Sequence, residues 1–119
     1  MNGSATIGSL CVLALIMASD AANKGILGEK TWEAYLRLKE KVGQCIDDEE
    51  SLLEQLGLSM TKRTRVSSAI EHKPPEFRTK IKTLASALIE ALKADVLRGS
   101  LGISLRRLET IQADLQEIG

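Results

Sequence analysis

The N-terminal stretch from Ala5 to Asn23 carries no charged residue before Asp20, and its apolar positions do not keep to one narrow stripe. Those positions are Ile7, Leu10, Cys11, Val12, Leu13, Leu15, Ile16 and Met17. A helix that is apolar on nearly every side lies either in the centre of a bundle or in lipid. The pattern therefore predicts a very apolar N-terminal helix, for which Ser4 is the expected N-cap.

Further segments have apolar residues at the three- and four-residue spacing of amphipathic helices. They are residues 29–46, a short acidic run at 47–57, residues 59–73, residues 75–97 and residues 103–118. The apolar positions in the first of these are Trp32, Tyr35, Leu36, Leu38, Val42, Cys45 and Ile46. Pro75 suits a first helical turn, and Gly99 interrupts the pattern that follows it. The fold class that we predict is all-α, a bundle of four to five helices.

The length of 119 residues indicates one domain. We expect residues 1–98 to form the core bundle and residues 103–118 to form a C-terminal amphipathic helix. Aromatic residues make up only 3% of the chain, so its core must be built from Leu, Ile, Val and Ala, which favours packed helices over a β-sandwich. Cys11 and Cys45 stand far apart without a CxxC motif, as is usual in a reduced cytoplasmic protein.

No catalytic or metal-binding motif occurs in the chain. There is no phosphate-binding GxxxxGK[ST] loop, no GxGxxG and no HExxH. His72 is the only histidine, and a lone histidine without partner ligands does not make a usual zinc site. We therefore expect a protein that is not an enzyme, with no catalytic residues, no metal and no cofactor.

The charges are balanced in number but unevenly placed. The 16 basic and 16 acidic residues give a net charge of zero, whereas nucleic-acid binders usually carry a basic excess, so we expect no nucleic-acid partner. The basic stretch between Lys62 and Lys82 is either an ordinary solvated helix face or a surface that attracts anionic lipid, by about 1 kcal/mol per residue near a membrane. The residues expected to bind lipid headgroups or a protein partner are Lys62, Arg63 and Arg65. The acidic face expected to meet a partner is Asp47, Asp48, Glu49 and Glu50.

Four explanations of the N-terminal stretch can be compared: a signal peptide, a membrane span, a central bundle helix and a helix that inserts after clustering. It lacks the positive start of a signal peptide, and it is shorter than the ~20 apolar residues of a membrane span. It is therefore either a central bundle helix or a helix that is buried at rest and inserts into a membrane after the protein clusters. The residues expected to insert are Leu10, Val12, Leu13, Leu15, Ile16 and Met17.

Residues 1–98 resemble the bacterial Bell domain, a small helical domain found beside NLR-type NTPase systems. The likeness lies in the apolar first helix, "GEKTWEAYLRLKEKV", the acidic run and "PPEFRTKIKTLASALIEAL". Bell domains are regarded as analogues of the fungal HeLo and HELL domains and of the four-helix executioner of necroptosis. The resemblance implies a pore-forming cell-death effector of bacterial immunity. It would be cytoplasmic at rest and would act at the inner face of the cell membrane. Its implied partners are other copies of itself, anionic lipids and an NLR-type sensor.

One departure from that group concerns activation. Such effectors are triggered by a templated amyloid motif, but the tail "RRLETIQADLQEIG" is charged and has helical spacing. Either a signalling motif lies beyond Gly119 or the trigger differs.

Two other functions compete with a pore-forming effector. The first is a helical adaptor, similar to death-fold domains, in which the acidic and basic faces of neighbouring copies pair. The second is a small DNA-binding or antitoxin-like protein that uses "TKRTRVSSAIEHK", which the zero net charge disfavours.

Overall fold

The computed structural model describes residues 6–46 and 60–118, and helices are the only regular elements in these two ranges. The helices are α1 (Ile7–Asn23), α2 (Glu29–Gly43), α4 (Met60–Glu71), α5 (Pro75–Leu97) and α6 (Leu105–Ile118). The predicted all-α bundle is therefore confirmed. The predicted acidic helix at 47–57 lies outside the described residues.

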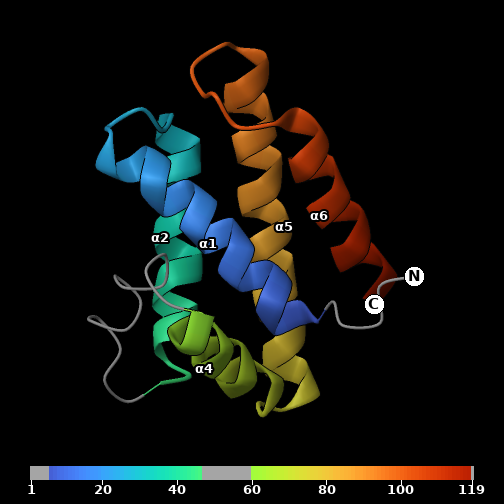
Figure 1. Ribbon diagram of the computed structural model, residues 1–119. Helices are drawn as coiled ribbons and strands as arrows, with labels where there is room; N and C mark the ends of the chain where they lie inside the picture. The colour runs from blue at the N-terminus through green and yellow to red at the C-terminus, as the bar shows by residue number, and fades with distance from the viewer. Residues whose placement is uncertain (1–5, 47–59, 119) are drawn as a thin grey trace.

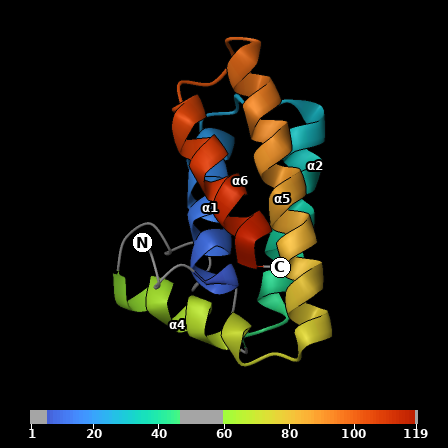
Figure 2. The same cartoon turned by 90° about the vertical axis from the view of Figure 1, so that its right-hand side faces the viewer.

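The helices form a bundle with α1 at its centre (Figure 1). α2 and α5 run antiparallel side by side, α1 crosses over them, and α6 lies beside α5. Seen from the side, α4 lies across one end of the bundle, under the N-terminal end of α1 (Figure 2). Consequently α1 packs against each of the other four described helices.

Ten of the 17 residues of α1 are buried, because neighbours surround the helix on most sides. No helix in the described ranges is both long enough and apolar enough to cross a membrane. The expected very apolar N-terminal helix is therefore not borne out, because α1 is not apolar over the length of a membrane span. Seventeen residues reach about 26 Å, and the last turn contains Asp20 and Asn23, both exposed.

The helix ends follow local chemistry. The N-cap of α1 is Thr6, not Ser4 as the sequence suggested: Ser9 N–H donates to Thr6 Oγ1 at 3.0 Å, and Thr6 N–H donates to Ser9 Oγ at 3.0 Å. Pro75 occupies the first turn of α5 as predicted. The chain turns after α5 at Gly99, whose φ of +82° favours glycine.

The core is aliphatic, as the low aromatic content predicted. Its fully buried side chains come from every described helix and include Leu38, Val66, Ile81, Leu92 and Leu115. Two of the apolar positions on α2, Trp32 and Leu36, lie outside the core, since they are 43% and 42% exposed. They share helical spacing with Tyr35, Leu38 and Val42 but lie on the flank of α2 that no other described helix covers.

Candidate functional site

The residues expected to insert into a membrane divide into two groups in the structure. Leu10, Val12, Leu15 and Met17 are buried, whereas Leu13 and Ile16 are half-buried and pack at the edge of the core. Exposing the first group therefore requires α1 to leave its four neighbours. In the resting bundle these side chains are core residues.

A close contact holds α1 against α4. The Gly8 N–H donates to Glu71 Oε2 at 2.8 Å, and Arg78 on α5 lies 3.7 Å from the other carboxylate oxygen of Glu71. A carboxylate at the first turn of a helix also suits the positive end of the helix dipole. A Cβ added at Gly8 would lie 2.4 Å from the Ser67 carbonyl oxygen, so the two backbones meet at a distance that only glycine allows. These contacts fix the start of α1 to the end of the bundle.

The other end of the bundle is closed by a buried carboxylate. Asp95 on α5 is completely buried, accepts a hydrogen bond of 2.9 Å from the Gly28 N–H at the start of α2, and pairs with Arg98. Gly28 has no side chain to cap α2, so Asp95 takes that role across 67 positions of sequence. Beside it, the buried Thr31 hydroxyl donates to the Ala91 carbonyl at 3.2 Å.

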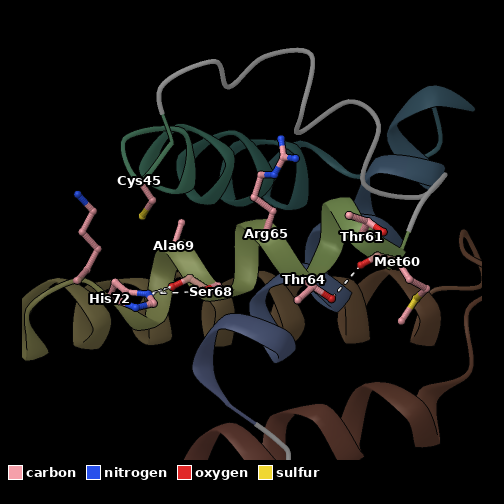
Figure 3. A pocket seen from close by; sticks show the side chains of 9 residues that line it. Cys45, Met60, Thr61, Thr64, Arg65, Ser68, Ala69 and His72 are labelled. Atoms are coloured by element: carbon pink, nitrogen blue, oxygen red, sulfur yellow. Dashed lines mark hydrogen bonds between the residues drawn. The ribbon is translucent and has the colours of Figure 1, made fainter.

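The outer surface of α4 contains a pocket. Its volume is about 940 Å³ and it opens widely to solvent. It is lined by Cys45, Met60, Thr61, Thr64, Arg65, Ser68, Ala69, His72 and Lys73. In Figure 3, Cys45, which follows α2, points toward α4, and the Arg65 guanidinium extends away from α4.

The three residues predicted to bind lipid headgroups do not all lie at the pocket. Arg65 is exposed and lines the pocket, whereas Lys62 and Arg63 are half-buried and do not line it. His72 and Lys73 join Arg65 there, although the sequence alone did not single them out as site residues. Their spacing of seven and eight positions from Arg65 is the signal that would have placed them on the same helix face. The predicted acidic face, residues 47–50, lies outside the described residues.

Several side-chain contacts set the orientation of these groups. His72 Nδ1 lies 2.7 Å from the Ser68 carbonyl oxygen, which can only accept, so Nδ1 carries the proton and Nε2 is left for another partner. The ammonium groups of Lys73 and Lys41 lie 5.6 Å and 4.9 Å from the centre of the Phe77 ring, on which both cations can rest. Lys73 forms no ion pair with any described acidic residue.

The two cysteines differ in environment. Burial raises the pKa of the Cys11 thiol far above its usual range, and the neighbouring Cys45 raises it further. Burial also raises the pKa of Cys45, but the nearby Lys73 and Lys41 oppose that shift because they stabilise the thiolate. No group of three His, Cys, Asp or Glu residues within 6–46 and 60–118 is arranged to hold a metal ion.

We expect Cys11 and Cys45 to differ in thiol reactivity, because the thiolate is the attacking species. In the native protein at pH 8, Ellman's reagent should modify Cys45 more slowly than a free thiol, and Cys11 only after denaturant is added. A Cys45→Ser variant should show no native-state reaction and one thiol on unfolding. Rapid reaction of that variant in buffer would contradict the buried position of Cys11.

Fold and pocket together define a small all-helical bundle with a cationic pocket on its end helix. No family model, curated protein or solved structure matches this chain. The resemblance to Bell domains therefore rests on the sequence features alone, and the functions that it implies are argued below as proposals.

Proposed function

We propose that this protein is a non-enzymatic, membrane-permeabilising effector that acts when copies of it cluster on an anionic membrane. The observation that carries the proposal is the position of α1. From Ile7 to Ser19 this helix has no charged side chain, and it is buried against four other helices beside the cationic surface of α4. An apolar helix is thus buried in the bundle next to a helix whose cationic side chains suit anionic lipid.

In the proposed mechanism, the cationic side chains of α4 bring the protein to the bilayer, and clustering there favours release of α1. Its small residues Gly8, Ser9, Ala14 and Ala18 allow several copies to approach closely in lipid. Because α1 is shorter than a bilayer core is thick, insertion is proposed into a locally thinned membrane. The Bell-domain resemblance adds an NLR-type sensor as the partner that would cause the clustering.

The test is dye release from vesicles of phosphatidylglycerol and phosphatidylcholine by the full chain, with and without a fused oligomeriser. Release is expected only with clustering. Leu13→Glu should slow it more than tenfold, because a carboxylate in the hydrocarbon core costs about 3 kcal/mol, which is well over tenfold in rate. Leu13 is half-buried, so glutamate there disturbs the resting bundle less than it would at Leu15.

Leu97→Glu is the matched control, since Leu97 is 72% exposed at the end of α5 and takes no part in the proposed insertion. It should release dye as the parent chain does, with circular dichroism checking that both variants are folded. Equal release by Leu13→Glu and the parent would contradict the proposal. Clustering without release from any vesicle would favour the adaptor function instead.

A further inference from the structure

We infer that α4 is a lid over the start of α1, held closed by the Glu71 carboxylate, and that it opens as one unit before the rest of the bundle unfolds. This one carboxylate joins three helices. Glu71 belongs to α4, its Oε2 accepts the Gly8 N–H of α1 at 2.8 Å, and its Oε1 lies 3.7 Å from the Arg78 guanidinium of α5. Loss of the carboxylate therefore loosens α1, α4 and α5 at the same point.

The backbones of α1 and α4 meet beside this carboxylate. A Cβ at Gly8 would lie 2.4 Å from the Ser67 carbonyl oxygen and 3.0 Å from Ser67 Cα. In Figure 2, α4 lies across the N-terminal end of α1. Release of the start of α1 and opening of α4 therefore break the same set of contacts.

The apolar contact between α4 and the rest of the described bundle is small. Two of its 12 residues are buried, Val66 and Ile70, and α1 is the described helix that α4 mainly packs against. By contrast, α5 buries six of its 23 residues and packs along α2, α1 and α6. Segments with few buried apolar side chains open at a lower free energy than the core does. A detached helix of 12 residues is unstable in water, so its amide hydrogens then exchange with solvent.

The junction between α4 and α5 allows the two helices to separate. It consists of His72, Lys73 and Pro74, and α5 begins at Pro75. Proline has no N–H and disfavours helical geometry in the residue before it, so the adjacent prolines keep α4 and α5 from joining into one helix. The lid can therefore open without unwinding the first turn of α5.

The inference deepens the proposed function, and the regulatory meaning of the lid rests on that function. The exposed Arg65 belongs to the same helix that holds α1 through Glu71. An anionic membrane that binds the open form of α4 more tightly than the closed form shifts the population toward a free α1. The helix proposed to meet the lipid is thus also the helix that restrains the inserting one.

The test is amide hydrogen exchange of the ¹⁵N-labelled full chain, without lipid, at urea concentrations well below unfolding. In the parent chain, the amides of residues 66–70 should exchange through an opening whose free energy depends weakly on urea. The buried Leu88 and Leu92 of α5 should exchange only through global unfolding, which depends strongly on urea. An identical urea dependence at both places would show that no lid opens on its own.

Glu71→Ala tests what holds the lid closed, and alanine keeps the helix propensity of α4 high. The variant should speed exchange at residues 66–70 about tenfold, because the closed state loses a charge-assisted hydrogen bond. Exchange at Leu88 should rise by the same factor, since the unfolded chain lacks that contact too. Unchanged exchange at residues 66–70 would rule out Glu71 as the group that holds α4.

Asp95→Ala is the matched control, because Asp95 also accepts a glycine N–H, from Gly28 at 2.9 Å, where α2 begins. That contact stays intact when only α4 opens. The control should therefore speed exchange at Leu88 and Leu92 and leave residues 66–70 unchanged. Equal acceleration at both places would mean that the bundle opens as a single unit, against the inference.

Dye release separates the lid from the proposed function. With the fused oligomeriser, Glu71→Ala should release dye from vesicles of phosphatidylglycerol and phosphatidylcholine faster than the parent. Glu109→Ala, which removes an exposed glutamate of α6, should not. Release by the parent that Glu71→Ala leaves unchanged would overturn the lid as a restraint on α1. No release by any chain, together with the expected exchange pattern, would contradict the effector function and support the lid.

Discussion

Replacing Gly8 with alanine is expected to lower the free energy of unfolding by about 3 kcal/mol, the upper part of the range for adding a methyl group to a full site. The new Cβ would lie 2.4 Å from the Ser67 carbonyl oxygen and 3.0 Å from Ser67 Cα. These are backbone atoms of α4, so relief requires α1 and α4 to move apart. That movement also lengthens the hydrogen bond from the Gly8 N–H to Glu71.

The sign of this effect is informative, because glycine to alanine inside a helix ordinarily stabilises a protein by up to ~1 kcal/mol. Gly102→Ala is the matched control, since a Cβ at Gly102 meets no atom within 4 Å and its φ is not positive. It should leave stability unchanged or raise it by a few tenths of a kcal/mol. Urea denaturation followed by circular dichroism gives both values. A Gly8→Ala variant as stable as the parent would mean that α1 and α4 do not meet as described.

Much of the fold could be predicted from the sequence, because helical periodicity reports which residues share a face. The segments 59–73, 75–97 and 103–118 contain α4, α5 and α6 with ends close to those observed. Periodicity does not report how far round a helix its neighbours reach. On α2 the covering helices stop short of Trp32 and Leu36, so side chains with core-like spacing stand partly in solvent.

The contacts that join the helices could not be predicted in the same way. Gly28 and Asp95 are 67 positions apart, as Gly8 and Glu71 are 63 apart, and neither pair has a local pattern. Gly28 has no side chain that could indicate its partner in the sequence. Its exact role follows from tertiary packing, which brings a carboxylate to the start of α2.

The candidate site was predicted in part. Arg65 was expected to face a ligand and does line the pocket, but Lys62 and Arg63 stand on α4 without lining it. A run of basic residues on a helix is spread around its circumference, so three neighbours in sequence rarely serve one site. His72 and Lys73 could have been found by extending one helix face from Arg65. Cys45 could not, because it comes from a different helix.

The second large effect concerns Asp95. Asp95→Ala is expected to lower the free energy of unfolding by about 2 kcal/mol, because it leaves the Gly28 N–H without its acceptor and α2 without its cap. Asp95→Asn should lose less, since the amide oxygen can still accept from Gly28 while the attraction to Arg98 is gone. Both values come from urea denaturation at neutral pH.

Asp20→Ala provides the matched control for this substitution. Asp20 is an exposed aspartate that pairs with Lys24 at 3.2 Å on the surface of the same end of the bundle, and such pairs contribute less than ~1 kcal/mol. The two aspartates thus differ in burial and in what they hold, not in chemistry. Equal losses for Asp95→Ala and Asp20→Ala would show that Asp95 acts only as a surface charge. A loss confined to Asp95→Ala, largely restored in Asp95→Asn, would show that the hydrogen bond from Gly28 to Asp95 stabilises the start of α2 more than the charge of Asp95 does.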